Sequence, residues 1–220
     1  DNNSNTSDNL SVSSFTIDIT TPTLSSVTIA SNNSVSTLGK TGDNITLSIT
    51  SAETIQTPSV SIAGQAATET GDNITWSAAY TMAGSDSQGS VSLNIGFSDL
   101  AGNAGIAVTS TTNEPAVEFD SISPVLLPVD NVTTPTSDNT SLSYTFSSTE
   151  AGTIRYGGDC DSDNDTAVAD NNTITFNALE DGTHSNCEIS VTDNASNTSY
   201  NLSVRSFTIG AITPALAEIE

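Results

Sequence analysis

Residues 193–209 read DNASNTSYNLSVRSFTI, and residues 1–17 read DNNSNTSDNLSVSSFTI. Fourteen of these seventeen positions are identical at an offset of 192 residues, far more than shared composition produces. A more distant third copy lies between them, because FSDLAGNAG at 97–105 resembles VTDNASNTS at 191–199. The chain is therefore built from repeated units, and this segment closes each unit.

The spacing of three prolines sets the expected domain boundaries. Each copy of the segment is followed by a strand-like stretch and then by Pro22, Pro124 or Pro214, which are 102 and 90 residues apart. This layout predicts a terminal strand of a preceding repeat at 1–20, a first domain at 22–122, a second domain at 123–212 and the start of a next linker at 213–220. Domains of about 90–100 residues have the size of an immunoglobulin-like sandwich.

Alternating apolar residues predict that both domains are all-β. In the first domain the alternating sets are Ile45, Leu47 and Ile49; Ile74, Trp76, Ala78 and Tyr80; and Val91, Leu93, Ile95 and Phe97. In the second they are Leu142, Tyr144 and Phe146; Ile154 and Tyr156; Ile174 and Phe176; Cys187, Ile189 and Val191; and Leu202 and Val204. No window of 12 residues has a helical period. We therefore expect two tandem immunoglobulin-like β-sandwich domains with about seven short strands each.

The composition favours many short strands with thin cores. Apolar residues make up 35% of the chain, and the polar remainder is rich in Ser, Thr and Asn. Val, Ile and Thr, which suit a pleated and half-buried surface, are frequent. No run approaches the roughly 20 apolar residues of a membrane span, so we expect no membrane insertion. Residue 1 already lies in a polar, strand-like segment, so we expect a processed product or an excerpt of a longer chain.

The charge is strongly acidic and limits the partners. Three basic residues stand against 26 acidic ones, for a formal net charge of −23. Nucleic acids and anionic membrane surfaces require clustered Lys and Arg, so neither is expected as a partner. A charge of this size keeps chains apart in solution and also attracts divalent cations. Both explanations, plain solubility and specific ion binding, remain open from the sequence.

Several segments resemble bacterial immunoglobulin-like tandem repeats of large surface and adhesin proteins. The second domain contributes YTFSSTEAGTIRYGGDC and NNTITFNALEDGTHSNCEISVTD, and the first contributes KTGDNITLSITSAETI and FSDLAGNAG. The resemblance implies an extracellular or cell-surface location and a role as a stalk, adhesin extender or fibre subunit. It brings no catalytic residues, and no pattern in the chain places a nucleophile beside a base, so we do not expect an enzyme.

Cys160 and Cys187 are the only cysteines, both in the second domain and 27 residues apart. In the extracellular context that the resemblance implies, an even count predicts a disulfide between them. Cys160 closes one predicted strand and Cys187 opens another, which should be neighbours in one sheet. The single histidine, His184, is expected in a turn before the Cys187 strand.

Two groups of acidic residues are candidate calcium ligands. The first is the run Asp159, Asp161, Asp163 and Asp165, whose alternating carboxylates resemble the first half of an EF-hand loop but lack its glycine and its final glutamate. A plain solvated turn explains this run equally well. The second group lies at the domain junctions: Asp18, Glu118 and Asp120, with the turn residues Asp99 and Asp193. Calcium there would stiffen a tandem array. Apart from Ca²⁺, no cofactor is expected.

Asn-x-Ser/Thr sequons are frequent, and Asn44, Asn73, Asn139 and Asn171 are candidate glycosylation sites. A chain this rich in Asn, Ser and Thr also produces such triplets by chance. Taken together, the sequence predicts a structural spacer or stalk of an extracellular repeat protein. Its partners would be neighbouring repeats or other copies of the chain. Two alternatives remain open: a self-assembling filament subunit, in which residues 1–17 join another copy's sheet, and a carbohydrate- or receptor-binding module.

Overall fold

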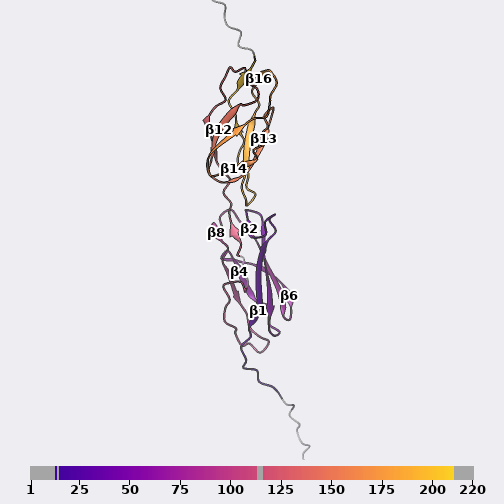
Figure 1. Cartoon of the computed structure of the whole chain (residues 1–220). Helices are drawn as coiled ribbons and strands as arrows, with labels where there is room; N and C mark the ends of the chain where they lie inside the picture. Colours follow the sequence, from indigo (N-terminus) through magenta and orange to yellow (C-terminus); the bar gives the residue numbers. More distant parts are fainter. Residues whose placement is uncertain (1–12, 14, 113–115, 211–220) are drawn as a thin grey trace, which may run out of the picture.

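The computed structural model describes residue 13, residues 15–112 and residues 116–210, and this part of the chain is all-β. It contains several sheets and no helix. None of its elements therefore has the length and apolar character of a helical membrane span. Figure 1 shows the strands in two groups that follow one another along the long axis of the protein.

The first group contains ten strands in three sheets. They are β1 (Leu24–Ser31), β2 (Leu38–Gly39), β3 (Asn44–Ser51), β4 (Ser59–Ile62), β5 (Gln65–Ala66), β6 (Thr68–Asp72), β7 (Thr75–Thr81), β8 (Gly89–Ser90), β9 (Leu93–Gly96) and β10 (Glu118–Phe119). The sheets have the strand orders β1-β3-β7-β6, β5-β4-β9 and β2-β10-β8. All pairs are antiparallel except the short parallel pair of β10 and β2.

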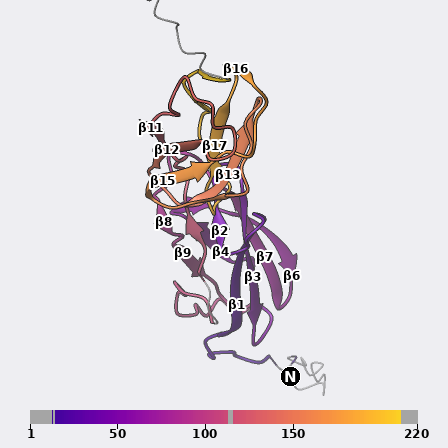
Figure 2. The same ribbon diagram turned by 45° about the horizontal axis from the view of Figure 1, so that its top comes forward.

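The second group contains nine strands, also in three sheets. They are β11 (Leu126–Asp130), β12 (Ser143–Ser148), β13 (Gly152–Gly157), β14 (Thr166–Ala167), β15 (Asp170–Thr175), β16 (Gly182–His184), β17 (Glu188–Thr192), β18 (Leu202–Ser203) and β19 (Phe207–Ile209). The sheets have the orders β11-β12-β15, β14-β13-β17-β18 and β16-β19. Figure 2 shows these strands stacked beyond β2, β4 and β8 of the first group.

Each group surrounds its own hydrophobic core, and both cores follow the predicted alternation. Ile45, Leu47 and Ile49 on β3 have no exposed surface, and Tyr144 and Phe146 on β12 are equally buried. The first core runs from Val27 to Phe119 and the second from Val132 to Ile209. The alternating residues thus face inward on paired strands, as a two-layer β architecture requires.

Two local expectations were wrong. Ile74 does not share the buried face of Trp76 and Ala78, and 43% of its surface is exposed. β7 begins only at Thr75, after Asn73 adopts a positive φ of 52°, so Ile74 belongs to the turn. His184 is not in a turn: it ends β16, pairs with Phe207 of β19 and is 8% exposed.

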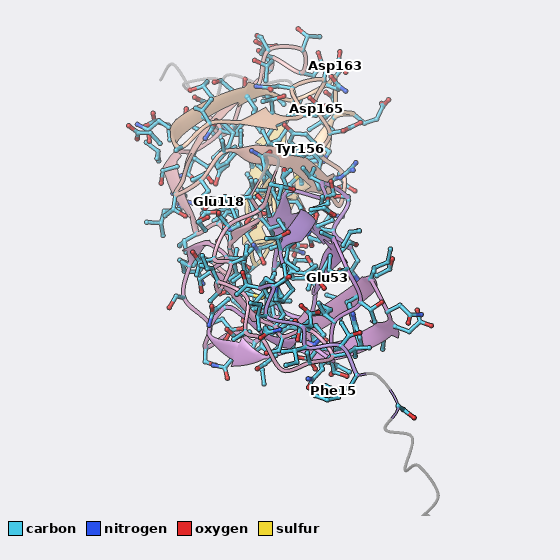
Figure 3. All side chains as sticks on the ribbon, turned by 90° about the horizontal axis from the view of Figure 1, so that it is seen from below. Phe15, Glu53, Glu118, Tyr156, Asp163 and Asp165 are labelled. Carbon is cyan, nitrogen blue, oxygen red and sulfur yellow. A yellow bond between two sulfur atoms is a disulfide. The ribbon has the colours of Figure 1, made fainter. Side chains whose placement is uncertain are left out.

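The segment 1–20 is described only from residue 13 onward, without residue 14. Half of the expected strand of residues 10–17 therefore lies outside the described residues. Residues 15–23 belong to no strand, and the apolar side chains of Phe15, Ile17 and Ile19 are 73–82% exposed. Phe15 lies at the margin of the protein (Figure 3).

Candidate functional site

Two clusters of three carboxylates stand out among the described residues. The first carboxylate cluster consists of Asp18, Glu53 and Asp99, and the second consists of Asp120, Glu150 and Asp193. Within each cluster, one oxygen from every carboxylate lies within 4.8 Å of the others. Carboxylate oxygens at this separation can converge on one hard cation such as Ca²⁺.

The two clusters are copies of one arrangement. In each, the second aspartate, Asp99 or Asp193, follows the core strand β9 or β17 and begins a tight turn that ends at Asn103 or Asn197. Asp99 Oδ1 accepts a hydrogen bond from the backbone N–H of Asn103 at 2.8 Å, and Asp193 Oδ1 accepts one from Asn197 at 2.9 Å. The side-chain amides of the same asparagines donate to the other carboxylate oxygen at 2.7 and 3.0 Å. The turn therefore fixes the orientation of a carboxylate that is at least nine-tenths buried.

The same asparagines connect each turn to the segment that leads into the group of strands. Asn103 Nδ2 donates to the carbonyl oxygen of Asp18 at 3.1 Å, and Asn197 Nδ2 donates to that of Asp120 at 3.0 Å. The linker aspartates also cap their own backbone, since Asp18 Oδ1 accepts from the N–H of Thr20 at 2.9 Å. Asp120 Oδ1 does the same for Ile122 at 2.9 Å.

The glutamates come from the end of the second long strand in each group. Glu53 follows β3 and Glu150 follows β12, two residues after a buried serine. The hydroxyl of that serine, Ser51 or Ser148, donates to the backbone carbonyl of the glutamate and holds the turn in place. Each cluster thus collects its ligands from three separate segments: the linker, the end of a long strand and the turn after β9 or β17.

Among the described residues, the one ion pair is that of His184 with Asp159, so no Lys or Arg there forms an ion pair with the second cluster. Burial raises the pKa of Glu150, and the neighbouring Asp120 and Asp193 carboxylates raise it further. In the first cluster, the side-chain hydrogen bond from Asn103 lowers the pKa of Asp99, although burial opposes this. A nearby divalent cation favours the charged form of a carboxyl, so it would oppose the effect that burial and the neighbouring aspartates have on Glu150.

The second cluster lies at the boundary between the two groups of strands. It contributes to the lining of a cavity of about 560 Å³, together with Leu38 and Phe119 of the first group. Asn33 Nδ2, also from the first group, donates to the carbonyl oxygen of Ala195 in the cluster's turn at 2.9 Å. The hydroxyls of Ser34 and Ser196 lie 3.4 Å apart.

The junction residues predicted from the sequence divide between the clusters and the surface. Asp18 and Asp120 lie in the clusters, together with the turn residues Asp99 and Asp193. Glu118 on β10 is exposed (Figure 3) and belongs to neither cluster, although it lines the same cavity as the second cluster. The sequence reasoning missed Glu53 and Glu150. Their signal was a shared Ser-x-Glu, SAE at 51–53 and STE at 148–150, directly after an alternating strand in both domains.

The predicted acidic loop 159–165 does not gather its carboxylates. Asp159 Oδ1 accepts from Asn186 at 3.0 Å, and its Oδ2 lies 3.3 Å from His184 Nδ1. Asp163 Oδ1 accepts a hydrogen bond from the side-chain amide of Asn177, and Asp165 Oδ1 accepts one from the hydroxyl of Thr166. Within the part of the chain that the structure describes, no three ligand atoms of this loop meet the 4.8 Å limit. Calcium binding by Asp161 and its neighbours therefore stays a prediction without a preformed site.

The predicted disulfide is present. Cys160 and Cys187 are bonded, with a Cα–Cα distance of 5.1 Å. They lie just beyond the pair Gly157 and Glu188, at the end of the antiparallel strands β13 and β17. The bond therefore closes one end of the sheet in the second group, as the sequence predicted.

The four sequons differ in accessibility. Asn73 is exposed in the turn between β6 and β7, and Asn171 is exposed on β15. Asn44 at the start of β3 and Asn139 in the loop before β12 are half-buried. Glycosylation at these positions stays a prediction.

No model of a known protein family matches the chain, and no curated protein matches it. Any statement about its function therefore depends on the geometry described above.

Proposed function

We propose that this chain is a structural spacer of an extracellular repeat protein, made of two tandem immunoglobulin-like sandwiches with a calcium site at each domain entrance. The observation that carries the proposal is the duplicated carboxylate cluster, because one ligand arrangement recurs where each linker enters its domain. The protein does mechanical and not enzymatic work: the domains set a length, and the ions limit bending at the joints.

The strand order supports the immunoglobulin-like assignment. In an immunoglobulin-like domain of constant type, the first, second, fifth and fourth strands form one sheet and the third, sixth and seventh form the other. The order β1-β3-β7-β6 opposite β5-β4-β9 follows this scheme, with Val108 bridging to Ile95 as a short seventh strand. The second group has the sheets β11-β12-β15 and β14-β13-β17-β18, and it departs from the scheme in one respect, since its fourth strand, β14, pairs with the third strand, β13.

The contacts at the boundary support a joint that an ion can stiffen. Asn33 donates a direct hydrogen bond across the boundary to Ala195, and a cavity of about 560 Å³ lies at the same boundary. Interfaces of this kind allow relative domain motion. An ion bound by Asp120, Glu150 and Asp193 would connect the linker to two segments of the second domain and so restrict the hinge.

The disulfide and the charge support an extracellular role. Disulfides persist in oxidising compartments, and the Cys160–Cys187 bond reinforces a domain with a thin core. A net charge of −23 suits a molecule that must stay soluble and unbundled.

The test is the solution length of the whole chain with and without calcium. Small-angle X-ray scattering should give a larger maximum dimension of the chain in millimolar CaCl₂ than in EDTA. Magnesium at the same concentration serves as the control, because its strict octahedral geometry suits such a carboxylate cage poorly. Identical scattering in all three conditions would exclude the stiffening role.

A second candidate function, recognition of a carbohydrate, is favoured by Tyr200. This aromatic side chain is 97% exposed and borders a small groove with Pro124, Val125 and Leu126. Exposed aromatic rings stack on sugar faces. A glycan array with the wild-type chain and the Tyr200→Ala variant separates the two functions, since a spacer gives no signal with either.

A further inference from the structure

Phe15 and Phe207 occupy the same place in two nearly identical segments but have opposite environments. Phe15 is 80% exposed, whereas Phe207 is 1% exposed. Ile17 and Ile209 show the same contrast, at 73% and 1%. Identical residues that form a core in one copy are therefore left against water in the other, and exposed large apolar groups in a row mark a surface that lacks its partner.

The buried copy shows what the segment does when it is docked. Leu202 on β18 pairs with Ile189 of β17, and β19 pairs with β16. Val204, Phe207 and Ile209 are at most 4% exposed in the second core. The ring of Phe207 stacks on Phe176 with centroids 6.4 Å apart. Residues 193–209 thus close the second sandwich and supply Asp193 to its carboxylate cluster.

The three positions that differ between the copies test whether segment 1–17 fits the same place. Asp8 stands at the position of Tyr200, which is 97% exposed, and Ser13 at that of the exposed Arg205. Neither exchange disturbs the core. Asn3 stands at the position of Ala195, which is 3% exposed, so this is the one exchange that places a larger polar group in a confined site.

We propose that residues 1–17 are a closing strand for a separate sandwich built like residues 123–192, where they pair with the equivalents of β16 and β17. The segment carries the four apolar residues that close such a domain: Leu10, Val12, Phe15 and Ile17, matching Leu202, Val204, Phe207 and Ile209. It also carries Asp1 and Asn5, matching the turn pair Asp193 and Asn197. This inference does not depend on ion binding.

The partner must lack a closing strand of its own. In a wild-type second copy, residues 193–209 already fill the place and are tethered to it, so their effective concentration exceeds that of a free segment. Wild-type chains therefore do not exchange segments at ordinary concentrations. When the place is vacant, docking of one chain's residues 1–17 into the next is a head-to-tail contact, which extends into a linear assembly.

The experiment creates the vacancy in the full chain. The double variant Phe207→Asp, Ile209→Asp removes the anchors of the chain's own closing strand and keeps everything else. Its size distribution at micromolar concentration is measured by analytical ultracentrifugation beside the wild type. The expected result is a ladder of oligomers for the variant and a single monomer for the wild type.

A matched variant separates specific docking from aggregation of an open domain. The quadruple variant Phe15→Asp, Ile17→Asp, Phe207→Asp, Ile209→Asp has the same open domain but no donor strand, so it should remain monomeric. A ladder in both variants would show unspecific association and overturn the proposal, as would monomers in both.

A second measurement tests the fit without any assembly. The triple variant Ala195→Asn, Tyr200→Asp, Arg205→Ser gives residues 193–209 the sequence of residues 1–17. If the segments are interchangeable, the second domain keeps its disulfide and its cooperative unfolding transition. Loss of that transition would overturn the proposal, whatever the oligomers show.

Discussion

The side-chain amide of Asn197 donates a hydrogen bond to the backbone carbonyl oxygen of Asp120 at 3.0 Å. Through this contact the turn after β17 holds the linker that enters its own domain, 77 residues earlier in the chain. Asn103 and Asp18 form the same contact in the first domain. A segment fixed in this way enters its group of strands in a defined orientation, as the proposed spacer function requires.

Asn197→Ala should destabilise the second group of strands by about 1–3 kcal/mol, because it leaves the buried Asp193 carboxylate without its amide donor and releases the linker. Urea unfolding followed by tyrosine fluorescence measures the change. The control is Asn194→Ala, the exposed neighbour in the same turn, which should stay within about 0.5 kcal/mol of the wild type. Equal effects of the two variants would contradict the assigned role of Asn197.

Glu150→Gln should have opposite effects with and without calcium. In EDTA the variant should melt at a higher temperature than the wild type, since it removes one of three crowded carboxylates. In excess calcium the second group of strands in the wild type should gain about 2.7 kcal/mol at a concentration of about 100 times Kd, and the second group in the variant should gain much less. Differential scanning calorimetry measures both conditions.

The matched control for that experiment is Asp163→Asn in the acidic loop 159–165. Its carboxylate belongs to neither cluster. Calcium should therefore stabilise this variant as much as it stabilises the wild type. If Asp163→Asn abolishes the stabilisation by calcium and Glu150→Gln does not, the ion binds the acidic loop, and the proposed calcium site at Glu150 is wrong.

The raised pKa of Glu150 predicts a pH dependence in the absence of calcium. Burial and the two aspartates raise the pKa of this carboxyl in the folded protein, so the folded state takes up a proton more readily than the unfolded chain. Stability must then fall as pH rises from the ordinary glutamate range through the raised pKa. Thermal melts in EDTA should show the wild type approaching Glu150→Gln as the pH falls from 7 to about 5. A difference in melting temperature between the wild type and Glu150→Gln that stays constant over this pH range would contradict the prediction.

Much of the fold could be predicted from the sequence, because the alternation of apolar and polar residues along a strand depends only on local chemistry. Ile45, Leu47 and Ile49 had to face one side of a strand, and they are fully buried. The carboxylate clusters were harder to predict, since each collects residues from three distant segments whose meeting depends on sheet order. Asp18 and Asp120 were found because they flank the linkers. Glu53 and Glu150 were missed because a single Glu after a strand reads as an ordinary solvent-facing turn.

Removal of the disulfide should weaken only the second domain. The bond closes a loop with a sequence separation of 27 residues, for which the chain-entropy model gives about 3–4 kcal/mol. The variant Cys160→Ala, Cys187→Ala should therefore shift one of two unfolding transitions to lower urea. The other transition is an internal control, since residues 22–122 contain no cysteine. A shift of both transitions, or of neither, would contradict independent unfolding of the two cores.

The second core also contains a polar group whose removal should be harmless. Tyr144 has no exposed surface, and among the described residues its hydroxyl is the one buried side-chain polar atom without a hydrogen-bond partner. Its ring lies between Phe146 and Phe176, with centroid distances of 6.4 and 6.2 Å. Burying an unpartnered hydroxyl costs about 1–3 kcal/mol, while the ring itself contributes to packing.

Tyr144→Phe keeps the ring and removes the unpartnered hydroxyl, so the free energy of unfolding should rise by about 1 kcal/mol or stay unchanged. The matched control is Tyr156→Phe, because the Tyr156 hydroxyl donates to the carbonyl oxygen of Asn164. That variant should lose about 0.5–1.5 kcal/mol. Urea midpoints of the second transition compare the two variants directly. If Tyr144→Phe destabilises the protein as much as Tyr156→Phe does, then a bound water satisfies the Tyr144 hydroxyl in solution, and the second core is less dry than its aromatic lining indicates.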